Sequence, residues 1–442
     1  MSRWKAHQTP LLVALAALVL GGLALAHPGL RFVDFVGFSG RARRVLQGQD
    51  MVHNLYPVGY PALLGGLKLL LGEVLPAGKL LSVLGGVLAF GAGLRLVGPL
   101  GALWMLALPA TLASGSTEGT DMLAAGLTLA ALTARHEERP ALAGALLGAA
   151  CLCRYTALAA VPLLLLVGPR RGRFLLALAL ATLPHWGLAL ALHRPVLPDQ
   201  GENLAIAAGH PTRLWSLDTL SRWPRGMWTA LVQGLGTWPA IAGALGLGLG
   251  LIRKDRRAGL LFGLASLHLA GLAVAFSNPR LCLPATLAAG LGMAFLVPER
   301  ARAAVVALSL GLLGWNTARE APLTPDEVEL TAVLPLAQQL GAPSCVSTSP
   351  LFHLRREGWL IPCGTVRAAG GDPRRIGPAQ VRDIAHSRGW LMLAVNLDKT
   401  RATLPGLRPF LSGSVPEGYD LVAETEAWRL FAILGNDGRR GF

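Results

Sequence analysis

Charged residues are scarce in this chain of 442 residues, where they make up 15% of the total, against roughly 25% in an ordinary soluble protein. Hydrophobic residues account for 52%, and the mean hydropathy is +0.49. This composition excludes a soluble enzyme and predicts a polytopic membrane protein. The net charge is +15, but the basic residues lie mostly in short clusters between apolar runs, the pattern that orients membrane proteins. We therefore expect no nucleic-acid binding.

Cysteines and metal-binding motifs are also scarce. Five cysteines are too few for a disulfide scaffold, and neither a CxxC…CxxC nor an HExxH motif appears. Cys345 and Cys363 are the only cysteines in the polar C-terminal part, and they would form a disulfide in an oxidising compartment if they lie close in space. There is no internal repeat, low-complexity tract or nucleotide-binding glycine pattern. The missing repeat argues against a transporter built from two related halves.

Apolar runs, by contrast, are abundant. A bilayer core of about 30 Å takes about 20 helical residues. The first run, which follows Arg3 and Lys5, also resembles a signal peptide, but the many later spans favour an uncleaved helix. Basic turns follow every second span, which predicts a cytoplasmic N-terminus and an outer C-terminal domain. The expected spans, about eleven, are residues 10–26, 77–97, 99–115, 120–134, 141–153, 155–168, 174–192, 229–251, 258–276, 281–297 and 303–318.

Residues 141–168 admit two interpretations, because two short apolar runs meet at Arg154. A single helix would place the arginine in mid-membrane and send the basic residues 170–173 to the outer side, against the charge rule. We therefore expect two short helices that meet near the outer face. Interrupted spans of this kind often line a binding site.

The first outer loop, residues 27–76, contains more polar residues than a connector needs. Apolar residues recur at steps of four after Asp34, which predicts an amphipathic helix on the membrane surface that ends at Gly48. The segment YPVGYP, residues 56–61, predicts an extended turn, and a second short helix follows over 62–71. Asp34 would cap the first helix, and the same position suits a general base.

Further polar candidates lie at outer helix ends. Glu118 and Asp121 lie in the next outer turn, where they either cap a solvated helix or contact a substrate. Arg154 and Arg280 are expected where a lipid phosphate would lie, a depth that snorkelling arginines also favour. The remaining candidates, which would line a sugar pocket or anchor the loop at the interface, are His53, Tyr56 and Tyr60.

The composition becomes that of a soluble protein near residue 320, which divides the chain into a membrane domain, 1–319, and an outer domain, 320–442. Thr324 and Glu327 form a capping-box pattern, which predicts a helix toward residue 340 that Pro335 would kink or interrupt. The pattern predicts a small α/β domain with strands at 344–347, 390–396, 421–424 and 429–434 and a helix at 380–387.

Together these segments resemble the C-type (GT-C) membrane glycosyltransferases. The pattern DxxxFxxxAxxxLxG of residues 34–48, followed by YPVGYP at 56–61, is similar to the first outer loop of that family. Residues 118–123 are similar to the acid that opens the fourth helix, 144–155 to the glycine-rich helix that ends in a cation, and 278–284 to the family's Arg-Tyr-x2-Pro. The resemblance covers most of residues 1–320 and implies the fold of that family.

The resemblance also implies an activity. Such an enzyme, in the bacterial cytoplasmic membrane, takes a sugar from a polyprenyl-phosphate carrier and transfers it, with inversion, to a glycan, lipid or protein acceptor on the outer face. Asp34 would be the general base, and Arg154 and Arg280 would meet the donor phosphate. Phe35 stands where the family often has a second acid, so the pair of carboxylates that would bind a divalent cation is absent, although the sequence does not exclude cation binding. Leu281 replaces the family's tyrosine. The alternative is a transporter or flippase without catalysis.

Overall fold

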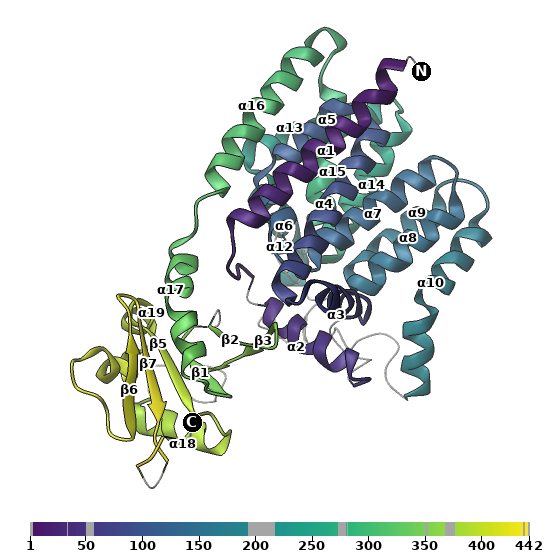
Figure 1. Cartoon of the computed structure of the whole chain (residues 1–442). Helices are drawn as coiled ribbons and strands as arrows, with labels where there is room; N and C mark the ends of the chain where they lie inside the picture. Colours follow the sequence, from purple (N-terminus) through teal and green to yellow (C-terminus); the bar gives the residue numbers. More distant parts are fainter. Residues whose placement is uncertain are drawn as a thin grey trace. The chain divides into compact units, whose positions relative to one another are not determined.

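The computed structural model describes residues 3–32, 34–49, 57–192, 217–272, 280, 282–349, 352–366, 376–435 and 438–440. These residues are mostly helical and end in a mixed sheet (Figure 1). They form two compact units. The helical unit comprises residues 1–26, 44–67 and 76–322, and the mixed unit comprises 27–43, 68–75 and 323–442.

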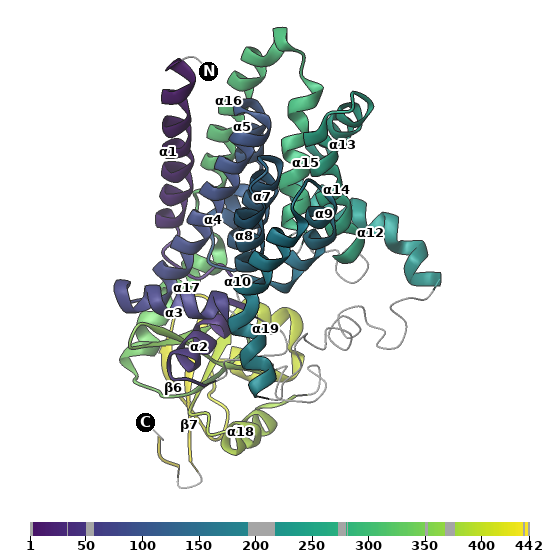
Figure 2. The same ribbon diagram turned by 90° about the vertical axis from the view of Figure 1, so that its right-hand side faces the viewer.

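The described parts of the expected spans are mostly helical. Figure 2 shows α1, α4, α7 and α8 with roughly aligned axes. The helices are α1 (Arg3–Ala26), α3 (Gly59–Leu71, shared with the mixed unit), α4 (Val74–Val97), α5 (Pro99–Ala107), α6 (Pro109–Ser116), α7 (Asp121–His136), α8 (Pro140–Cys153), η1 (Tyr155–Ala160), α9 (Val161–Leu166), α10 (Arg171–Ala191), α12 (Leu217–Leu235), α13 (Thr237–Ile252), α14 (Arg256–Leu272), α15 (Leu283–Leu296), η2 (Glu299–Ala301) and α16 (Arg302–Glu320).

Among the described helices, three are long and apolar enough to cross a membrane alone: Thr9–Ala26, Val74–Val97 and Arg171–Ala191. A fourth is the pair Pro224–Leu235 and Thr237–Ile252, which is bent by 112°. These spans indicate an integral membrane protein. The total of eleven spans and the orientation remain predictions.

The expected break at Arg154 is confirmed, because α8 ends at Cys153 and Arg154 is extended, with φ −156° and ψ 126°. Two spans expected as single helices are broken, so those predictions were wrong. The run 99–115 breaks at Leu108, since the following proline disfavours helix there. The run 229–251 breaks at Gly236, whose φ of +84° favours glycine.

Small residues bring α4 and α7 close together. A Cβ atom added to Gly126 would lie 2.1 Å from the carbonyl oxygen of Gly85, so neither helix could approach as closely with a larger residue there. Ser82 of α4 also donates a hydrogen bond of 3.3 Å to the carbonyl of Gly119. The turn that precedes α7 is thereby held against α4.

Basic turns gather at one end of the helical unit. Arg95, in the last turn of α4, pairs with Glu137 at the end of α7 over 2.8 Å. The buried Arg135 donates from Nε to the carbonyl of Leu164 at 2.9 Å and from Nη1 to that of Pro169 at 2.8 Å. The ends of α4, α7 and α9 therefore lie together, which is the arrangement that the charge pattern predicts.

The mixed unit contains a five-stranded sheet of order β4-β1-β5-β7-β6, in which β4, β1 and β5 are parallel and β7 and β6 antiparallel. The strands β2 and β3 form a separate hairpin. The elements are α2 (Asp34–Leu46, shared with the helical unit), α17 (Pro325–Gln339), β1 (Cys345–Ser347), β2 (His353–Arg356), β3 (Trp359–Pro362), β4 (Gly364–Thr365), α18 (Pro378–Ser387), β5 (Met392–Asn396), α19 (Leu397–Thr403), η3 (Pro405–Leu411), β6 (Tyr419–Glu424) and β7 (Trp428–Ile433).

Most of the elements expected in this unit are confirmed. Thr324 and Glu327 form the capping box, and Pro335 lies inside α17 without ending it. The disulfide between Cys345 and Cys363 is present and joins β1 to the residue after β3. The short strands β2, β3 and β4 were not predicted. They lack the alternating apolar run that identifies a strand in sequence.

The residues of the first outer loop are divided between the two units. Hydrogen bonds with the C-terminal part of the chain hold α2 in the mixed unit. Leu360 N donates to Ser39 Oγ at 3.0 Å, and Ser39 Oγ donates to the Leu360 carbonyl at 3.2 Å. Val74 N donates to the Gly358 carbonyl at 2.9 Å. The tip of the β2–β3 hairpin thus contacts the start of α4, while its second strand holds α2.

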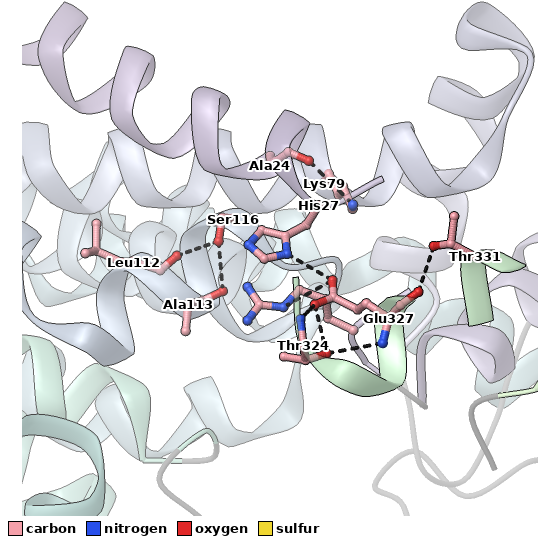
Figure 3. A network of polar contacts seen from close by, with 10 residues as sticks. Ala24, His27, Lys79, Leu112, Ala113, Ser116, Thr324, Glu327 and Thr331 are labelled. Carbon is pink, nitrogen blue, oxygen red and sulfur yellow. Dashed lines mark hydrogen bonds and ion pairs between the residues drawn. The ribbon is translucent and has the colours of Figure 1, made fainter. Parts of the chain in front are cut away.

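A buried polar network joins the segment before α2 to α17. Figure 3 shows Glu327 directed toward both His27 and Thr324. His27 Nδ1 lies 3.0 Å from Glu327 Oε1, and the other carboxylate oxygen accepts a 2.9 Å hydrogen bond from Thr324 N. Arg31 Nε lies 3.6 Å from the same carboxylate. Burial raises the pKa of Glu327, but the Thr324 hydrogen bonds and the charges of Arg31 and His27 outweigh it and lower the pKa overall.

This network predicts an acid-sensitive mixed unit. Because the pKa of Glu327 is lower in the folded state, its stabilisation is complete above the unfolded value of 4.5 and is lost as the pH falls through the folded value. In the Glu327→Gln variant, we expect the amide hydrogens of residues 323–435 to exchange faster than in the wild type at neutral pH. This difference in exchange rate should shrink below pH 4.5. Glu426→Gln, at an exposed position, is the control. An equal difference at all pH values would contradict this prediction.

Candidate active site

Asp121 begins α7 and lies at the centre of a charged cluster in the helical unit. Its neighbour Thr120 is the N-cap residue of α7. Asp121 is 7% exposed, so its carboxylate has left water and needs compensating partners. A carboxylate in the first turn of a helix is favourably placed against the helix dipole.

Two arginines from different segments flank this carboxylate. Arg154 Nη1 lies 2.6 Å from Asp121 Oδ1, as a close ion pair, and donates a 2.7 Å hydrogen bond to Thr120 Oγ1. Arg280 donates to Asp121 Oδ2 from Nη2 at 3.1 Å and from Nε at 3.3 Å. The break after α8 gives Arg154 its position, and Arg280 lies just before α15.

The cluster has one more positive than negative charge. A guanidinium carries five N–H donors, and Asp121 and Thr120 take only some of those on Arg154. The cluster also contributes to a pocket with Thr156 and Pro284, whose volume is about 10 Å³. That space holds about one water molecule. A larger anion therefore needs the arginine side chains to move apart.

Tyr60 and Glu118 are the other expected residues that the helical unit buries, with 0% and 1% exposure. A Cβ atom on Gly59 would lie 2.6 Å from the carbonyl of Leu152, so the start of α3 contacts the end of α8. Burial, followed by the nearby charge of Glu118, raises the pKa of Tyr60 well above its usual value. Its hydroxyl is therefore neutral at physiological pH.

Of the remaining sequence candidates, the structure describes only Asp34. Asp34 is the exposed first residue of α2 and belongs to the mixed unit. His53 and Tyr56 lie outside the described residues. Among the residues that the structure describes, no group of three or more His, Cys, Asp or Glu side chains is arranged to hold a metal ion.

Three polar residues near helix ends were missed. Lys79 of α4 is 6% exposed, and its Nζ donates to the carbonyl of Ala24 at 3.5 Å. Tyr155, directly after Arg154, has its hydroxyl 2.8 Å from Nε2 of the buried His185 on α10. Isolated polar residues in apolar helices were the available signal, because a membrane rarely tolerates them without a partner.

Comparison with solved structures shows that the chain shares the fold of ArnT. The chain is similar to ArnT from Cupriavidus metallidurans bound to undecaprenyl phosphate, with a TM-score of 0.63 and 16% identity over 96% of this chain and 98% of ArnT. For ArnT in the apo state the TM-score is 0.63 and the identity 15%, over 97% and 98% of the two chains.

A further similarity, to the arabinofuranosyltransferase AftD from mycobacteria, has a TM-score of 0.43 and 16% identity. It covers 97% of this chain but 40% of AftD. No protein-family model and no curated protein matches the sequence. The solved structures therefore establish the fold, and function must be argued from the site.

Proposed function

We propose that this protein is a membrane glycosyltransferase that moves a sugar from a polyprenyl-phosphate carrier to an acceptor on the outer face of the bacterial cytoplasmic membrane. The observation that carries the proposal is the buried Asp121 held between Arg154 and Arg280. A fold shared with ArnT, which was crystallised with undecaprenyl phosphate, supports the same class of donor.

The arginine pair suits a phosphate that gains charge during the reaction. As the bond from the sugar to the phosphate breaks, the bonding electrons stay with the phosphate oxygen, and its negative charge grows. Positioned guanidinium groups stabilise such charge without supplying a proton. Asp121, which Arg154 approaches to 2.6 Å, would orient the two cations and would itself remain paired.

The acceptor must lose a proton as its hydroxyl oxygen bonds to the anomeric carbon. We assign the general-base role to Asp34, whose carboxylate is exposed at the head of α2. In an oxocarbenium-like transition state the proton is removed late, so an ordinary carboxylate suffices. Attack opposite to the leaving phosphate inverts the configuration of the sugar.

The mixed unit would keep Asp34 in place. Ser39, one helical turn after the first residues of α2, exchanges two hydrogen bonds with Leu360 and is fully buried. These contacts fix α2 against the β2–β3 hairpin, while Cys363 ties the end of that hairpin to β1. A catalytic group on a fixed helix needs less reorganisation to react.

A panel of polyprenyl-phosphate sugars incubated with the purified protein in nanodiscs tests this proposal. We expect release of the free carrier phosphate when a suitable donor and acceptor are both present, measured by chromatography of the lipid products. A transporter or flippase would move a labelled lipid across the bilayer without cleaving it. Translocation without release of carrier phosphate from any donor would overturn the enzyme assignment.

A further inference from the structure

Three helix-to-helix turns of the helical unit meet around a second pocket. They join α4 to α5, α13 to α14, and α15 through η2 to α16. The cavity has a volume of about 430 Å³, within the range of about 300–1,000 Å³ typical of ligand sites. It is far larger than the pocket at Asp121, which measures about 10 Å³.

This pocket lies far from the Asp121 cluster. Val97, the last residue of α4, lines it, and Arg95 in the same turn pairs with Glu137 at the end of α7. Asp121 is at the other end of α7, which has 16 residues. At about 1.5 Å per residue the helix separates the two sites by roughly 20 Å.

Positive charge dominates the lining, which includes Arg253, Arg257 and Arg302 but a single acid, Asp255. Arg257 neutralises that acid, because its Nη2 and Nε donate to Asp255 at 2.6 and 3.0 Å. Arg257 also lies over the ring of Phe295, with Cζ 5.8 Å from the centroid. One of the three arginines is thus committed to the protein itself.

The other two arginines keep most of their capacity for an anion. Arg253 donates from Nη1 to the carbonyl of Phe295 at 3.2 Å, a partner that carries no net charge. Arg302 pairs with Glu299 at 3.2 Å, but the Glu299 side chain is 85% exposed. Exposed pairs of this kind contribute little. Two guanidinium groups therefore line the pocket without a buried counter-ion of their own among the other lining residues.

Apolar residues form the rest of the lining, among them Val97, Leu100 and Phe295. A free inorganic phosphate would satisfy the arginines and leave these side chains in contact with water. A phosphate that carries a glycerol backbone and acyl chains would cover them as well. Basic pockets between membrane helices are known to suit anionic lipid headgroups.

We propose that this pocket binds the phosphate headgroup of an anionic membrane lipid, held by Arg253 and Arg302 against the apolar wall of Val97, Leu100 and Phe295. The site is separate from the charged cluster at Asp121 and does not depend on the proposed reaction. Its occupant would tie together the three turns that close this end of the helical unit.

The test measures lipid affinity by native mass spectrometry of the full chain titrated with phosphatidylglycerol. We expect Arg253→Gln with Arg302→Gln to lower that affinity at least ~10-fold, because the variant loses two guanidinium groups that would donate charge-assisted hydrogen bonds to the headgroup. Arg139→Gln with Arg173→Gln removes the same charge from helix starts outside the pocket, and we expect it to change the affinity little.

Two outcomes would overturn the proposal. If both double variants lose affinity equally, the lipid is attracted only by the overall positive charge at this end of the helical unit. Displacement of the lipid by inorganic phosphate or glycerol phosphate, at the same concentration of headgroup, would mean that the pocket recognises a soluble anion. Phosphatidylcholine, which has no net charge, should bind wild type and variants alike.

Discussion

Replacing Asp34 by asparagine is expected to lower sugar transfer by at least ~100-fold, since general-base catalysis contributes about 10²–10⁴-fold. Asparagine keeps the size of the side chain, so α2 and its contacts through Ser39 should remain. Donor affinity should change little, because Asp34 is assigned to the acceptor proton. The measurement is the rate of carrier-phosphate release in nanodiscs at saturating donor.

Asp398→Asn provides a matched control, because Asp398 also lies in the first turn of a helix of the mixed unit and is exposed. It should transfer sugar at the wild-type rate. If Asp34→Asn also keeps that rate while Asp121→Asn loses it, the base belongs to the Asp121 turn. If neither substitution slows the reaction, neither carboxylate is the general base.

Removing either arginine of the Asp121 cluster should weaken donor binding by about 10- to 100-fold, the equivalent of one lost charge-assisted hydrogen bond. We expect Arg154→Gln and Arg280→Gln to fold, because Asp121 keeps one cationic partner in each case. Binding of a fluorescent polyprenyl phosphate in nanodiscs measures the effect directly.

The two arginines should differ in what else they disturb. Arg154 also holds Thr120, the N-cap residue of α7, so Arg154→Gln should lower thermal stability more than Arg280→Gln. Arg139→Gln, at a largely exposed position, is the control for a lost positive charge. If donor affinity and turnover are unchanged in both variants, the donor phosphate does not bind at the Asp121 cluster.

Features that depend on neighbouring residues could be predicted from the sequence. The break at Arg154 followed from charge and span length, and the capping box of α17 from the spacing of Thr324 and Glu327. The bends at Leu108 and Gly236 were missed, although a proline and a glycine were visible there. In an apolar helix such residues are tolerated often enough that their presence does not fix a break.

Features that depend on distant residues could not be predicted. Arg280 and Asp121 were each expected at an outer helix end, but their contact joins positions 159 residues apart. The contact of Ser39 with Leu360 spans 321 positions and moves the helix of Asp34 into the mixed unit. No periodicity or local motif encodes such pairings, because they arise only when the helices pack.

The mixed unit is built from segments that lie far apart in the sequence, and this affects how it folds during translation. Its first piece ends at residue 43 and its last begins at residue 323, so 279 residues of largely membrane-embedded chain lie between these two pieces. At about 5–20 residues per second, translation of that interval takes roughly 14–56 s. During this time α2 emerges from the ribosome without Leu360, its hydrogen-bonding partner. A chain truncated before residue 360 would lack this partner of α2 altogether.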